Sequence, residues 1–353
     1  MDRQVWFGVL LTTLVTRACI GQSYQVAPEV RAFLAKHAAV TEAELAGLQA
    51  GQPIAKLLPS HENREVVVFG TIRIDVPLRF FLDQSRDIEH FKASPLVPQI
   101  GKFSDPPSVA DLARLTIDGE DLMALSKCKS GVCPVKASLE MMQDFRQQAS
   151  HTPFSAQEAN AAWRKMLARY VENYSARGGP ALVVYADKAG SVNLNVEFQS
   201  LLAESSFLHE YAPQLEQELT GFPSSQSPRV EGFLYWSKEN YAPKSLVSIT
   251  HMLIYPVQRQ GASWCFIASK QIYASHYSEG SLGTTILAEG ATESGQPFVW
   301  VMYMNRSRVD ALRGWFVPLK RFVLTGRART GMAQNLGLLK TRLEQQYRQK
   351  PHD

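Results

Sequence analysis

The chain lacks the short motifs that commonly mark a catalytic site. Its 353 residues contain no G-x-S-x-G serine elbow, no Walker loop, no GxGxxG and no HExxH. They also contain no internal repeat and no low-complexity segment, which argues against a solenoid and against extensive disorder. We therefore expect a folded protein that uses no cofactor.

Cysteine is scarce, with four residues in the whole chain. Cys128 and Cys133 enclose a short loop that contains Gly131, and we predict that they form a disulfide in an oxidising compartment. No second Cys or His pair follows at a zinc-like spacing, so we predict no metal site. Cys265 falls within a strand-like stretch and is expected to be a small core residue.

No apolar run is long enough to cross a bilayer comfortably, since a spanning helix needs about 20 such residues. The run at 5–15 follows Arg3 and precedes the small residues Ala18, Cys19 and Gly21. We interpret residues 1–21 as a secretory signal peptide, which predicts export to the periplasm or the extracellular space. An uncleaved anchor or a buried helix is the alternative.

Lipoprotein anchoring through Cys19 is a further alternative for the N-terminus. Thr16 and Arg17 precede this cysteine and make a poor lipoprotein box. We therefore favour a cleaved signal without a lipid anchor.

Hydrophobic periodicity predicts an α+β fold. Residues 22–64 are expected to form a helical arm, 78–91 a helix that follows Pro77, and 318–347 a long basic helix. Turn chemistry is expected at 278–283 and 289–295, within the last strand pair. The predicted strands are 65–75, 96–103, 230–237, 245–255, 263–277 and 296–309.

The order of these elements predicts a curved antiparallel sheet that grips the C-terminal helix. The predicted domain covers 65–353 and is interrupted by a helical insertion at about 105–228. The stretches 74–81 (IDVPLRFF) and 305–321 (NRSRVDALRGWFVPLKR) resemble the start and end of START-like and polyketide-cyclase-like helix-grip domains. That resemblance implies an apolar cavity for a lipid, sterol or aromatic ligand between sheet and helix.

The residues expected to line such a cavity come from the last strands and from one face of the C-terminal helix. They are Tyr273, His276, Trp300, Met302, Met332, Leu336 and Leu339. Our first hypothesis is therefore an exported binding protein for a lipid or another hydrophobic small molecule. A structural envelope protein without a ligand is another possibility.

A cyclase-like or hydrolase-like enzyme that uses His276 is a further alternative. The polar residues that could converge inside the sheet are His251, Lys270, Tyr273, His276, Asn305 and Arg306. A Ser275, His276 and Asp310 triple could also be assembled. The alternative that we favour is that Lys270 and Arg306 point to solvent and the histidines are satisfied locally, because charged groups are seldom buried unpaired.

Positive charge is concentrated at the C-terminus. Residues 306–350 hold eleven Lys and Arg against two carboxylates, a net charge of +9 in a chain of +4. Basic helices often contact anionic membranes, so Arg327, Arg329 and Arg342 are predicted membrane or anion contacts. The alternative is a solvated face that pairs with the acidic insertion. Nucleic acid is not an expected partner of an exported chain.

Overall fold

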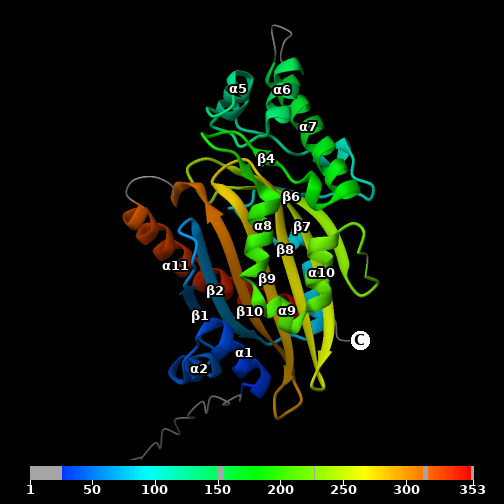
Figure 1. Cartoon of the computed structure of the whole chain (residues 1–353). Coiled ribbons are helices and arrows are strands. Elements are labelled where there is room, and N and C mark those ends of the chain that lie inside the picture. The colour runs from blue at the N-terminus through cyan, green and yellow to red at the C-terminus, as the bar shows by residue number, and fades with distance from the viewer. Residues whose placement is uncertain (1–25, 149–154, 226, 313–316, 351–353) are drawn as a thin grey trace, which may run out of the picture.

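The computed structural model describes residues 26–148, 155–225, 227–312 and 317–350, with the backbone alone for 317–325 and 327. Its centre is an open eight-stranded antiparallel sheet, ordered β1-β2-β10-β9-β8-β7-β6-β3 (Figure 1). The strands are β1 (Ile54–Leu58), β2 (Glu65–Ile74), β3 (Gln99–Lys102), β6 (Glu231–Glu239), β7 (Leu246–Arg259), β8 (Ala262–Ala274), β9 (Ser278–Ala291) and β10 (Pro297–Val309).

Helices cover both faces of this sheet. One face packs against α3 (Leu78–Arg86), α4 (Ile88–Phe91) and the long α11 (Val317–Gln349). The other face packs against α1 (Pro28–Ala38), α2 (Glu42–Gln49), α8 (Leu194–Ala203), α9 (Ser206–Tyr211) and α10 (Pro213–Gly221). Figure 1 shows α8, α9 and α10 in front of the sheet, whereas α11 runs behind it. The predicted α+β class, with a C-terminal helix against a curved sheet, is confirmed.

Within the stretch predicted as a helical insertion, α8, α9 and α10 cover a face of the sheet, whereas the part before them forms a cap at one end of the sheet (Figure 1). The cap contains η1 (Val109–Leu112), α5 (Gly119–Lys127), α6 (Leu139–Gln148), α7 (Ala156–Arg177), η2 (Gly179–Ala181) and the small hairpin β4 (Val184–Tyr185) and β5 (Val192–Asn193). The stripe on α7 that includes Trp163, Tyr170 and Tyr174 is buried. A capping box between Ser155 and Glu158 begins this helix.

The C-terminal helix lies close to β2 because the strand has a glycine at the contact. A Cβ added at Gly70 would lie 2.6 Å from Met332 Cγ and 2.7 Å from Leu336 Cδ1. At the other end of α11, Arg342 donates to the Phe91 carbonyl at 2.7 Å, and the Tyr347 and Phe80 rings lie 5.1 Å apart. These contacts fix α11 against β2 and the α3–α4 pair.

The prediction of a turn at 278–283 is wrong, because these residues begin strand β9. Gly283 lies opposite Asn305 of β10, and a Cβ there would lie 2.9 Å from the Tyr303 hydroxyl oxygen. The glycine therefore serves a close side-chain approach within the sheet rather than a turn. The true turn follows residue 291, where Thr292 N–H donates to the Gln296 carbonyl at 2.9 Å.

The helical arm predicted at 22–64 also contains a strand that the sequence did not indicate. After α1 and α2, β1 pairs with β2 and forms one edge of the sheet. Among the described residues, no helix is long and apolar enough to cross a membrane. The predicted signal peptide and Cys19 lie outside the described residues.

Candidate functional site

A cleft of about 780 Å³ opens beside the edge of the sheet where β3 ends. Its walls come from the end of β3, the C-terminal ends of α7 and α10, and the first half of β6 and β7. Aromatic and aliphatic side chains such as Phe103, Phe222 and Leu253 share these walls with polar and charged ones such as Lys102, Asp105 and Glu218. A volume of about 300–1,000 Å³ is typical of small-molecule sites.

The cleft lies where the chain leaves the sheet after β3 and where it enters the sheet before β6. β3 pairs with β6 only as far as Lys102, and the Phe103 N–H then donates to the Leu234 carbonyl at 2.9 Å. The opposite wall is formed by Phe222, Pro223, Ser227 and Pro228. Gly178, at φ 62°, ends α7 against this wall, since a Cβ there would lie 1.8 Å from the Phe222 carbonyl oxygen.

His251 is a buried ionisable group of the cleft, as is Glu218, whose carboxylate accepts from the Ser227 N–H at 3.1 Å. Its Nδ1 lies 2.9 Å from the Tyr174 hydroxyl, and its ring lies 4.4 Å from the Phe222 ring. Burial, and next the charge of Lys270, lower the pKa of His251 to about 3. The imidazole is therefore neutral at physiological pH, and its second ring nitrogen lies beside Gly232, another residue of the cleft wall.

Lys270 lies next to His251 on the neighbouring strand, because the two residues are register partners in β7 and β8. Its side chain is 2% exposed. Nζ donates to the Leu219 carbonyl at 3.2 Å and lies 3.9 Å from the Phe198 ring centroid. Within the described part of the chain no carboxylate pairs with it, and burial lowers the pKa of Lys270 to about 7.

The structure distributes the seven predicted ligand-binding residues over separate places. Met332, Leu336 and Leu339 pack on the face covered by α3 and α11. Trp300 and Met302 are buried on the opposite face. Successive residues of a strand point to opposite faces, and β10 places Val299 and Val301 toward α11. Tyr273 belongs to the core beneath the helical cap, where its hydroxyl donates to the Lys136 carbonyl at 2.9 Å.

His276 forms a buried hydrogen bond with Asp121 rather than a triad. Its Nε2 lies 2.7 Å from Asp121, whose other oxygen accepts from Lys244 Nζ at 3.1 Å. Burial acts to raise the pKa of Asp121, but hydrogen bonds and charge from His276 and Lys244 outweigh it and leave that pKa below its ordinary value. The Asp310 carboxylate instead accepts from Lys188 at 2.7 Å, so the predicted triple is not assembled. Ser275 Oγ accepts from the Val247 N–H at 2.9 Å.

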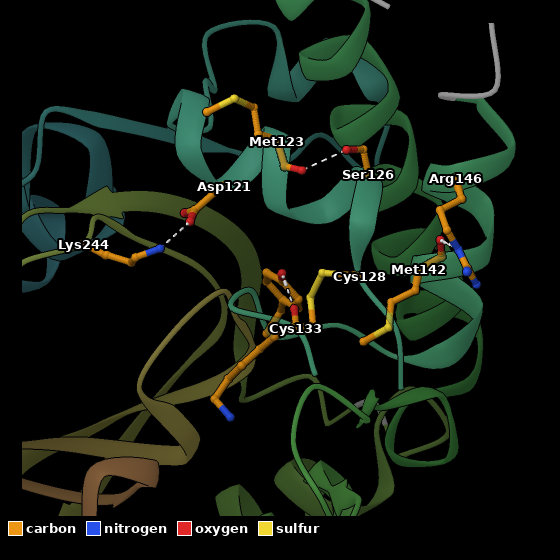
Figure 2. The surroundings of a disulfide bond; sticks show 10 residues. Asp121, Met123, Ser126, Cys128, Cys133, Met142, Arg146 and Lys244 are labelled. Atoms are coloured by element: carbon orange, nitrogen blue, oxygen red, sulfur yellow. Dashed lines mark hydrogen bonds and ion pairs between the residues drawn. A yellow bond between two sulfur atoms is a disulfide. The ribbon is translucent and has the colours of Figure 1, made fainter. Parts of the chain in front are cut away.

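The predicted disulfide between Cys128 and Cys133 is present. Figure 2 shows it below α5, the helix that also carries Asp121 and its contact with Lys244. Cys265 is buried and unpaired, as predicted. No group of metal-ligating side chains gathers anywhere in the described ranges.

Arg306 belongs to a buried charge network near the C-terminal end of β10. It donates to Glu65 at 2.6 Å and to Glu204 at 3.2 Å. The nearby Asn305 donates to Ser281 at 3.2 Å. The expectation that Lys270 and Arg306 point to solvent is therefore wrong, because both side chains lie inside the fold.

The three predicted membrane contacts differ in their surroundings. Arg329 is exposed on α11. Arg342 stacks on the Phe91 ring and donates to its carbonyl, and burial lowers the pKa of its guanidinium. The side chain of Arg327 lies outside the described residues.

No family model, no curated protein and no solved structure matches the chain. The arrangement of sheet and C-terminal helix is compatible with a helix-grip fold. The cleft and its residues are therefore the features that point to a function.

Proposed function

We propose that the protein binds a small, largely hydrophobic molecule in the cleft beside β6. The observation that carries this proposal is a ligand-sized cleft with aromatic side chains in its walls and a buried, neutral histidine. The aromatic and aliphatic side chains can hold a hydrophobic body, and the imidazole, together with the polar side chains of the cleft, can contact a polar group of the ligand. Such a site binds and orients a ligand without requiring a reaction.

This proposal keeps the ligand class that the sequence suggested but changes the location of the ligand. The space beneath α11 is occupied by Met332 and Leu336, which contact β2 at Gly70. The cleft lies instead at the opposite edge of the sheet, beside β6 and β3. Export to an oxidising compartment remains part of the proposal and is supported by the N-terminal segment and the disulfide. Contact of α11 with an anionic membrane is a separate proposal, for which Arg329 is the exposed candidate.

Filling the cleft is expected to abolish ligand binding. Ser175 is a half-buried residue of α7 that lines the cleft, and Ala176 is its exposed neighbour outside the cleft. Ser175→Trp should weaken binding of the amphipathic fluorescent probe anilinonaphthalene sulfonate by about tenfold or more, because the indole occupies the probe's volume. The measurement is a fluorescence titration of the full-length exported protein.

Ala176→Trp is the matched control, since it adds the same side chain to the same helix. It should bind the probe as the parent does, and all three proteins should show the same far-UV circular dichroism. Equal binding by the parent and Ser175→Trp would contradict the proposed site.

A further inference from the structure

The floor of the cleft contains an unpaired strand edge. Leu234 turns its carbonyl to the β3 side, where it accepts from Phe103. Alternate residues of an antiparallel strand direct their N–H and C=O groups to the same side. Both backbone groups of Gly232 and the Val230 carbonyl therefore face the cleft, and within the described residues none of them has a hydrogen-bond partner there.

If β3 continued past Phe103 along β6, it would fill the cleft and pair with these backbone groups. β3 pairs with residues 235–238 of β6, and the chain leaves the sheet after Phe103. The free edge consists of the four residues from Val230 to Phe233 and spans about 10 Å at roughly 3.3 Å per residue, which matches a segment of about four residues. The cleft volume of about 780 Å³ suits a segment of this size better than a strand of a further domain.

The side walls of the cleft suit the alternating side chains of an extended chain. Phe222, Leu253 and the His251 ring lie on one side of β6. Phe233 lies on the other, with Lys102 Nζ 4.0 Å from its ring centroid. A bound strand would therefore place successive side chains against apolar surface on both sides, while its backbone faces β6.

We propose that the ligand of this cleft is a free extended oligopeptide of about four residues that adds as a strand to the edge of β6. The proposal rests on the cleft being the binding site and specifies its ligand. Free strand edges are usually covered in folded proteins, and here the covering element is the ligand. Main-chain hydrogen bonds supply the affinity, and the aromatic walls select apolar side chains.

N-methylation of the peptide backbone provides the test. The probe is an N-acetylated, C-amidated tetrapeptide of alternating valine and threonine, which should displace anilinonaphthalene sulfonate from the protein. Two analogues carry methyl groups on the nitrogens of residues one and three, or of residues two and four. Only alternate N–H groups of a paired strand face its neighbour, so one analogue should bind at least about tenfold more weakly and the other within about twofold of the parent peptide.

The protein offers a second readout at Gly232. With glycine-selective ¹⁵N labelling, the Gly232 amide signal should shift and gain protection from hydrogen exchange on addition of the tetrapeptide. The Gly261 amide, in the β7–β8 turn outside the cleft, should not change. Equal weakening by both methylation patterns, or an unchanged Gly232 signal, would overturn strand addition.

The two proposals fail in different ways. If the fluorescent probe binds and Ser175→Trp prevents it, but the tetrapeptide does not compete, the cleft remains the site and the peptide inference is overturned. If the probe itself binds equally to the parent and Ser175→Trp, the proposed function is overturned.

Discussion

Replacing Leu336 with aspartate is expected to lower the free energy of unfolding by at least about 3 kcal/mol. Leu336 is 4% exposed and packs against β2 at Gly70. The substitution removes a large buried apolar side chain and places a carboxylate where leucine packs against Gly70. We therefore expect α11 to lose its packing on the sheet, and urea unfolding followed by circular dichroism measures the change.

Leu338→Asp is the control on the same helix. Leu338 is 69% exposed, so this variant should differ from the parent by no more than about 0.5 kcal/mol. The pair of variants tests whether α11 is attached to the sheet through the Leu336 face. Similar stabilities for Leu336→Asp and the parent would show that it is not.

Replacing Lys270 with methionine is expected to stabilise the protein by about 1–4 kcal/mol near neutral pH. The lysine is buried, no carboxylate pairs with it within the described ranges, and the Phe198 ring face offsets only part of the cost of burying its charge. Methionine has a similar length and carries no charge. The variant leaves the Leu219 carbonyl without this donor, which is the smaller effect.

The pH dependence of this difference follows from the pKa of Lys270. Burial lowers it from 10.5 to about 7, so between these values the unfolded chain binds more protons than the folded protein. The parent's free energy of unfolding contributed by this group therefore rises with pH from about 7 to 10.5. The advantage of Lys270→Met should be largest below pH 7 and should shrink toward pH 10.5.

Lys136→Met is a control for which we expect a stability change of the opposite sign. Lys136 is also buried, but its Nζ lies 3.6 Å from both Asp187 and Asp310. Its removal leaves two carboxylates without this cation and should destabilise the fold by about 3–5 kcal/mol. A pH-independent difference between Lys270→Met and the parent would show that Lys270 is not an isolated buried amine.

The sequence predicted most of the elements of the fold, but it did not indicate which strand residues face which helices. The strands β6, β7, β8 and β10 carry apolar residues on both sides because helices cover both faces of the sheet. The alternation of apolar and polar residues along a strand therefore cannot show which side chains point to which face of the sheet. This is why Trp300 was grouped with Leu336, although the two lie on opposite faces.

The cleft itself could not be predicted, because its walls come from segments far apart in the chain. Phe103, Ser175, Phe222 and His251 have no common motif or spacing. Pro223 and Pro228, which also belong to one wall, lie between α10 and β6 and carry no pattern that indicates a cleft. The unpaired edge of β6 depends on where β3 ends, which is set by tertiary contacts such as that between Gly101 and Trp236.

Native mass spectrometry of the exported protein, followed by organic extraction, tests the cleft as a ligand site most directly. The account predicts that the parent and Ala176→Trp carry the same non-covalent small molecule and that Ser175→Trp is empty. An empty parent, or the same bound mass in Ser175→Trp, would contradict it.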